Sequence, residues 1–98
     1  MRVRKQWHVG AECIHLEHHT LRGRYVLTDD DGTLLWTKCQ FVDFGCDTMV
    51  RLKNGILVGR LQASVSFSLT RFRYRLLNTD GDVVACEDAT RRYAQLED

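Results

Sequence analysis

Proline is absent from the 98-residue chain. Proline often protects the edge strands of β-sheets, so here that protection would have to come from charge, bulges, sheet closure or a partner strand. The sequence also has no apolar stretch of the roughly 20 residues that a membrane-spanning helix needs. Residues 1–8 lack the apolar core of a signal peptide. These absences predict a cytoplasmic protein with no membrane association.

Several catalytic motifs are missing as well. The chain has no C-x-x-C pair, no G-x-S-x-G motif and no glycine-rich phosphate loop, so we expect no enzymatic activity and no cofactor. The 14 basic and 13 acidic residues give a net charge of +1, well short of the basic excess typical of nucleic-acid-binding domains. Ninety-eight residues suffice for one hydrophobic core, so residues 1–98 are expected to form a single domain.

The chain has four cysteines: Cys13, Cys39, Cys46 and Cys86. An even number of cysteines in a short chain indicates disulfides only where the compartment is oxidising. Because the sequence shows no secretory signal, we expect four thiols and no disulfide. Most of these thiols should be buried, as reduced cysteines usually are.

Alternation of apolar and polar residues dominates the sequence, whereas helical periodicity is scarce. The clearest strand is predicted at residues 61–70, where apolar residues alternate with hydroxyl and amide residues. A long apolar run at residues 34–44 predicts a strand buried on much of both faces. Tight turns are expected at Asp31-Gly32, Asn54-Gly55 and Asp80-Gly81.

The alternation changes phase after residue 69, because Phe72, Tyr74 and Leu76 are apolar at even positions. One strand cannot keep a single face buried through that change, so a β-bulge or a turn is expected near Thr70-Arg71. Near the end of the chain, apolar residues at helical spacing predict a short helix within residues 87–96.

These patterns predict an all-β, mainly antiparallel fold. We expect a small β-barrel or a strongly curved sheet of about seven or eight strands, followed by a short C-terminal helix. The core should contain the following residues: Trp7, Tyr25, Leu27, Trp36, Phe41, Leu61, Val65, Phe67, Phe72, Tyr74 and Leu76.

A weak repeat relates residues 24–35 to residues 73–84, in which Arg, Tyr, Leu, Asp and Gly recur in register. Two unrelated hairpins that use the same turn chemistry would produce such a similarity. A duplicated two-strand unit with pseudo-symmetry would produce it too.

Four residues close in sequence are potential metal ligands: Cys13, His15, His18 and His19. Residues two apart on a strand share a face, so two zinc ligands can come from one strand. The set could be completed by Cys39, Cys46 or His8. The alternative to a metal site is that Cys13 is simply buried and that the histidines lie at a polar strand end and turn. Without a C-x-x-C motif we predict no metal site.

The alternation in residues 71–76 places three arginines on the side opposite the core: Arg71, Arg73 and Arg75. The repeat suggests the same for Arg22 and Arg24. Five guanidinium groups on one sheet face would attract phosphates or carboxylates. Alternatively, the arginines pair with acids on neighbouring strands, with Asp43, Asp47 and Glu17 as candidates.

The arginines are the best candidate for a binding surface. By elimination, the sequence favours a non-enzymatic interaction module, resembling an adaptor or an inhibitor, that binds a protein partner or its own copy through this face or a sheet edge. One alternative is a nucleic-acid-binding β domain. The other is a small zinc- or thiol-dependent enzyme.

Overall fold

The computed structural model describes residues 2–40, 42, 44–66 and 71–88, and within them nine strands form two antiparallel sheets. Sheet A has the order β4-β3-β2-β1-β9 and contains β1 (Arg2–Val9), β2 (Glu12–His19), β3 (Arg24–Thr28), β4 (Leu34–Cys39) and β9 (Cys86–Asp88). Sheet B has the order β5-β6-β7-β8 and contains β5 (Cys46–Arg51), β6 (Leu57–Val65), β7 (Phe72–Asn78) and β8 (Val83–Val84). The all-β antiparallel prediction is confirmed.

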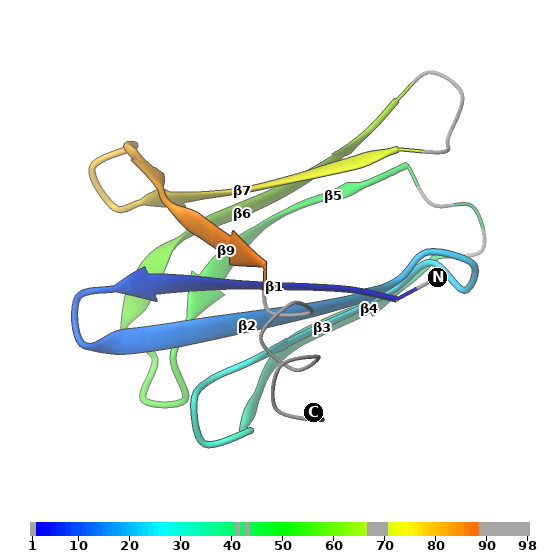
Figure 1. The fold of residues 1–98 in the computed structure, drawn as a ribbon. Coiled ribbons are helices and arrows are strands. Elements are labelled where there is room, and N and C mark those ends of the chain that lie inside the picture. The colour runs from blue at the N-terminus through cyan, green and yellow to red at the C-terminus, as the bar shows by residue number, and fades with distance from the viewer. Residues whose placement is uncertain (1, 41, 43, 67–70, 89–98) are drawn as a thin grey trace, which may run out of the picture.

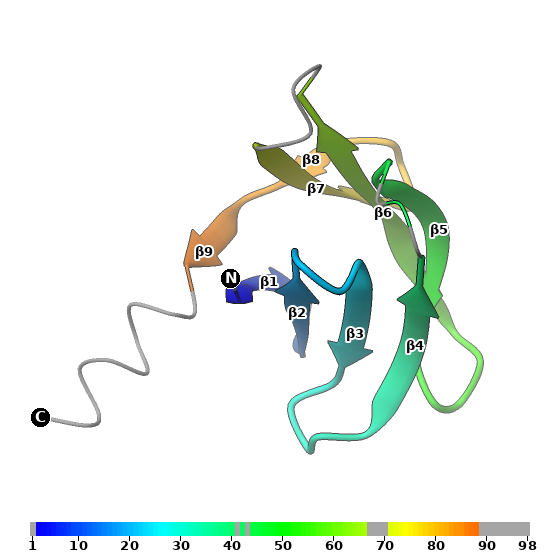
Figure 2. The same cartoon turned by 90° about the vertical axis from the view of Figure 1, so that its right-hand side faces the viewer.

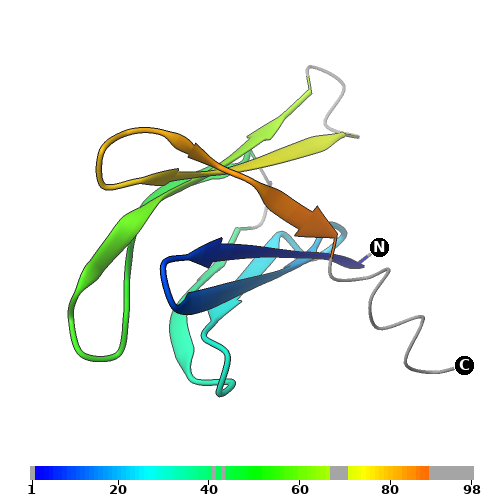
Figure 3. The same ribbon diagram turned by 60° about the vertical axis from the view of Figure 1, so that its left-hand side comes forward.

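Each sheet is built around a four-strand meander. Strands β1 to β4 pair in chain order, and β5 to β8 repeat that arrangement. The last strand, β9, then crosses from sheet B and pairs with β1 at the edge of sheet A (Figures 1 and 3). The inner faces of the two sheets pack against each other and contribute to one hydrophobic cluster.

The sheets are not closed into a barrel, which corrects that part of the prediction. Strands β4 and β5 are edge strands of different sheets and share no ladder within the described residues, although they follow each other in the chain (Figure 2). Gly45 lies just before β5 with a φ of 90°, and the Gln40 side chain donates to its carbonyl at 2.8 Å. The chain thus leaves sheet A after Cys39 and starts a second sheet at Cys46.

The expected long strand at residues 34–44 is also wrong. Strand β4 ends at Cys39, and both Leu34 and Phe44 are more than half exposed. The reason is its place at the edge of sheet A, where it has a neighbour on one side only. Only Leu35 and Trp36 pack partly against the core.

Most of the predicted core is confirmed. Five predicted residues are fully buried: Trp7, Tyr25, Leu27, Leu61 and Leu76. Four others are half-buried: Trp36, Val65, Phe72 and Tyr74. Phe41 and Phe67 lie outside the described residues. The core also contains residues that the sequence did not single out, among them Ile14, Leu16 and Val50.

His18 lies fully buried where the two sheets meet. Its ring stacks on Tyr25 of sheet A, with centroids 4.0 Å apart and planes inclined by 9°. On the side of sheet B, its Nδ1 shares a hydrogen bond with the Tyr74 hydroxyl, and Phe72 meets the ring edge-on at 4.7 Å. His18 is therefore part of the core and links the sheets.

The three predicted turns are confirmed, and all have the same construction. In each, the glycine amide donates to the first residue of the turn: Gly32 to Asp29 at 3.1 Å, Gly55 to Leu52 at 2.8 Å and Gly81 to Asn78 at 3.0 Å. Each of these glycines has φ between 82° and 88°, a region that side chains with a Cβ rarely adopt. The turn glycines therefore fix where each of these hairpins reverses.

The sequence repeat has a structural counterpart. Strand β3 and its turn correspond to β7 and its turn, and Asp29 and Asn78 each accept two backbone amide hydrogen bonds at 2.9 Å. The strand pairs also match: Leu16 faces Leu27 in sheet A, as Leu61 faces Leu76 in sheet B. This correspondence over several strands favours the duplicated unit over two unrelated hairpins.

The change of phase near Thr70-Arg71 results from a chain reversal. Val65 pairs with Phe72, and the Ser66 amide donates to the Arg71 carbonyl at 2.8 Å, so β6 and β7 form a hairpin. The expected helix at residues 87–96 falls mostly outside the described residues, and its first two residues belong to β9.

All four cysteines are thiols, but only Cys13 is buried, so the expectation of mostly buried cysteines is wrong.

Candidate binding face

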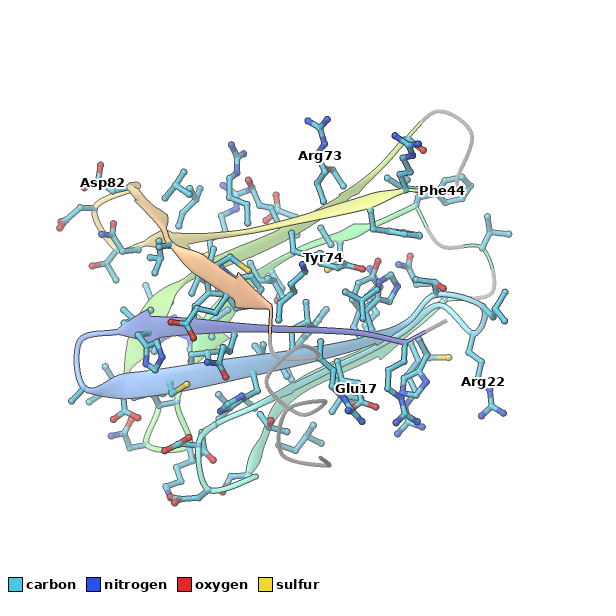
Figure 4. All side chains as sticks on the ribbon, in the orientation of Figure 1. Glu17, Arg22, Phe44, Arg73, Tyr74 and Asp82 are labelled. Carbon is cyan, nitrogen blue, oxygen red and sulfur yellow. The ribbon has the colours of Figure 1, made fainter. Side chains whose placement is uncertain are left out.

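The outer side of sheet B carries five arginines, which we call the arginine face: Arg51, Arg60, Arg71, Arg73 and Arg75. Arg73 and Arg75 alternate with inward residues of β7, and Arg71 directly precedes that strand. Arg71, Arg73 and Arg75 are exposed, as predicted, while Leu76 is buried. Figure 4 shows Arg73 pointing away from the molecule and Tyr74 pointing between the sheets.

Part of this face is neutralised by one carboxylate. Asp47 on β5 accepts two hydrogen bonds from Arg60 on β6, both at 2.6 Å. These hydrogen bonds hold the pKa of Asp47 below its usual range and raise the pKa of Arg60. In the same row of the sheet, Gln62 lies opposite both Asp47 and Arg75 and accepts from the Arg75 guanidinium at 3.0 Å.

Arg71 and Arg73 differ from Arg60 and Arg75. Their guanidinium groups make no ion pair or hydrogen bond with any residue that the structure describes. They border a shallow hollow of about 410 Å³ whose described lining consists of Ser64, Val65, Ser66, Arg71 and Arg73. Ser64 pairs directly with Arg73 across β6 and β7. Two guanidinium groups and two serine residues thus surround one exposed depression.

A second row on the same face consists of three apolar side chains and Arg60. Met49, Arg60, Leu77 and Val83 lie opposite one another across the four strands of sheet B. Met49 is 52% exposed and Val83 is 63% exposed. The face therefore combines an arginine-rich end with exposed apolar surface.

Arg22 and Arg24 do not join this face, so the expectation of five guanidinium groups on one sheet face is wrong. Arg24 opens β3 of sheet A, and Arg22 lies in the turn before it. Figure 4 shows Arg22 at the end of the sheet A hairpin, away from Arg73. The repeat places equivalent strands in two different sheets, so equivalent side chains face opposite sides of the molecule.

The acids predicted to pair with the arginines are also separated. Asp47 binds Arg60, which the sequence did not single out. Glu17 lies on sheet A, where it contacts Arg2 at 3.1 Å, Arg4 at 3.7 Å and His19 at 2.7 Å. Asp43 lies outside the described residues.

The four potential metal ligands do not form one group. His18 is in the core, and His19 is bound to Glu17. Cys13 and His15 stay together on the outer side of sheet A, where Asp30 joins them. His8 lies opposite Cys13, but its Nε2 is 3.8 Å from a Glu87 oxygen. Cys39 is at the end of β4, and Cys46 belongs to sheet B.

Comparisons with known proteins give no family for this chain, since no protein-family model, no curated protein and no solved structure matches it. Within the described residues, no helix is long and apolar enough to span a membrane. Function must therefore be argued from the two outer faces alone.

The sequence missed some members of the arginine face. Arg60 lies in a strand whose polar residues are mainly uncharged, and Arg51 precedes a turn, so neither belongs to an obvious charged pattern. Ser64 and Ser66 could have been found, because the strict alternation of residues 61–66 predicts that both face solvent.

Proposed function

We propose that the protein is a non-enzymatic interaction module that binds an acidic segment of a protein partner on the arginine face. The observation that carries this proposal is the pair Arg71 and Arg73, which face solvent beside the serine-lined hollow without an ion pair among the described residues. Guanidinium groups bind carboxylates in a bidentate geometry, so two of them side by side suit consecutive acidic side chains.

The charge balance of sheet B supports this proposal. Strands β5, β6 and β7 contain one acidic residue, Asp47, and that carboxylate is already bound to Arg60. Like charges in neighbouring positions of a strand face repel one another unless an opposite charge offsets them. An acidic partner would supply the missing negative charge.

The apolar row favours a protein over a nucleic acid. Exposed apolar side chains next to arginines are typical of the centre of a protein interface. Single-stranded nucleic acids are usually bound by aromatic side chains that stack on bases. Here the aromatic residues of β7, Phe72 and Tyr74, lie on the inward side of the strand. Nucleic-acid binding is therefore the second candidate, supported by the arginines alone.

The proposal can be tested by recording amide correlation spectra while a capped oligoglutamate peptide is added. We expect the largest shifts at Ser64, Arg71 and Arg73, and weaker binding as salt is raised. An oligolysine peptide of equal length serves as the control. Shifts confined to sheet A, or no shifts at all, would contradict the proposal. Tighter binding of a DNA duplex than of oligoglutamate at equal salt would favour the second candidate.

A further inference from the structure

A cysteine, a histidine and an aspartate converge on the outer side of sheet A. The thiol of Cys13, a ring nitrogen of His15 and a carboxylate oxygen of Asp30 all lie within 4.8 Å of one another. His15 Nε2 lies 3.3 Å from Asp30 Oδ1. Cys13 is 8% exposed, whereas the Asp30 side chain is 76% exposed, so the cluster reaches from the protein interior to solvent.

Local structure explains this convergence. Cys13 and His15 are two apart on β2 and therefore share its outer face. His15 pairs with Thr28, the last residue of β3, and the turn that follows brings Asp30 back beside His15. The neighbouring Asp29 carboxylate accepts the turn amides of Asp31 and Thr33, so Asp30 is not needed to form the turn.

We propose that Cys13, His15 and Asp30 bind a zinc-like divalent cation. Thiolate, imidazole and carboxylate are the three side-chain donors that proteins offer to zinc. Bonds of about 2.0–2.3 Å to a tetrahedral zinc separate neighbouring ligand atoms by about 3.3–3.8 Å, so a small contraction of the cluster suffices. Three protein donors leave the fourth tetrahedral position to water.

The surroundings suit a cation at this position. Asp30 supplies a negative charge, and the Cys13 thiol supplies a second when it loses its proton on metal binding. The opposing residues on β1 are occupied elsewhere: Gln6 donates to Glu87, and the His8 ring is turned toward Glu87.

The second meander, β5 to β8, can be compared with the first at the positions of these donors. The strand pairings place Arg60 at the position of His15, since His15 faces Thr28 and Arg60 faces Leu77, and the repeat places Thr79 at the position of Asp30. Neither side chain is a usual zinc donor. The donor set is therefore specific to one meander and is not a by-product of the hairpin construction.

The test is binding of Co²⁺ and Zn²⁺ to the full chain, with Co²⁺ followed by its thiolate-to-metal absorption band. We expect one ion per chain and a band that disappears in Cys13→Ser. His15→Asn and Asp30→Asn should weaken binding by more than the roughly 10- to 100-fold losses seen for outer-shell residues. Asp30 is exposed, so Asp30→Asn should leave the fold intact. This variant therefore tests the site even if Cys13→Ser fails to fold. His19→Asn and Cys39→Ser are the matched controls and should bind like the parent.

A second readout comes from alkylation of the four thiols, mapped by mass spectrometry. Zinc should slow the modification of Cys13 and leave Cys39 and Cys86 unchanged, and this protection should weaken at lower pH. The proposal is overturned if the parent gives no thiolate band, if the band survives in Cys13→Ser, or if Asp30→Asn binds as tightly as the parent. None of these results bears on the arginine face, which lies on the other sheet.

Discussion

The two sheets differ in how the charges on their strands are balanced. The strands of sheet A carry five basic residues (Arg2, Arg4, Lys5, Arg24 and Lys38) and four acidic ones (Glu12, Glu17, Glu87 and Asp88). The strands of sheet B carry four basic residues (Arg51, Arg60, Arg73 and Arg75) and one acidic residue, Asp47. Sheet A is close to neutral, whereas sheet B has an excess of positive charge.

On the inner faces, by contrast, several corresponding positions carry the same residue. Leu16 and Leu61 are both buried and both face a buried leucine, and Tyr25 and Tyr74 both contact His18. The shared fold thus constrains these inward residues in both meanders. The outward residues are less constrained, so the two sheets can differ there in charge.

The largest effect is expected for the matched core leucines. Leu16→Ala and Leu61→Ala should each lower the free energy of unfolding by about 2–5 kcal/mol, because each removes a fully buried side chain from the shared core. Urea denaturation of the two variants measures both losses. A loss below about 1 kcal/mol in one variant only would show that the two meanders do not contribute equally to the core.

A smaller effect is expected where the sheets are linked by a polar contact. Tyr74→Phe removes the hydroxyl that binds Nδ1 of the buried His18 and should cost about 0.5–1.5 kcal/mol. The same denaturation experiment detects this loss. A variant as stable as the parent would indicate that the hydrogen bond is not part of what holds sheet B on sheet A.

The balanced charges of sheet A should matter even less for stability. Glu17→Gln removes contacts with Arg2, Arg4 and His19 on a partly exposed surface, so the expected loss is about 0–1 kcal/mol. High salt should reduce this loss further, because exposed ion pairs are screened. A loss of several kcal/mol, unaffected by salt, would mean that Glu17 has a role in folding.

The smallest effect is the pH response of Asp47. Its pKa is lowered in the folded protein, so its pair with Arg60 contributes stability above the unfolded pKa and loses that contribution as pH falls through the folded pKa. Carbon NMR titration of the Asp47 carboxyl should give a pKa below the usual aspartate range, and Arg60→Gln should raise it. An unchanged pKa of Asp47 in that variant would show that Arg60 does not cause the lowered pKa.

Local features of the fold could be predicted from the sequence. The three turns depend on a glycine at one defined position, and the outward direction of Arg71, Arg73 and Arg75 depends on strand alternation. Both are set within a few residues, which explains why these predictions are confirmed.

Features that depend on pairing between distant residues could not be predicted. Separation into two open sheets depends on which strands pair, and that pairing puts Arg24 in a different sheet from Arg73. The pair Asp47–Arg60 and the proximity of Asp30 to His15 likewise arise from strand register. His18 occupies the core because β2 alternates, yet a histidine gives no apolar signal in sequence.

We propose that binding of an acidic partner belongs to sheet B and not to basic residues in general. The most direct test measures oligoglutamate binding to two variants of equal charge change, Arg71→Glu/Arg73→Glu and Arg22→Glu/Arg24→Glu, after circular dichroism shows that both are folded. We predict that the first variant binds roughly tenfold or more weakly, equivalent to about 1.4 kcal/mol, while the second binds nearly as the parent does. Equal losses in both variants, or no loss in the first, would contradict the claim.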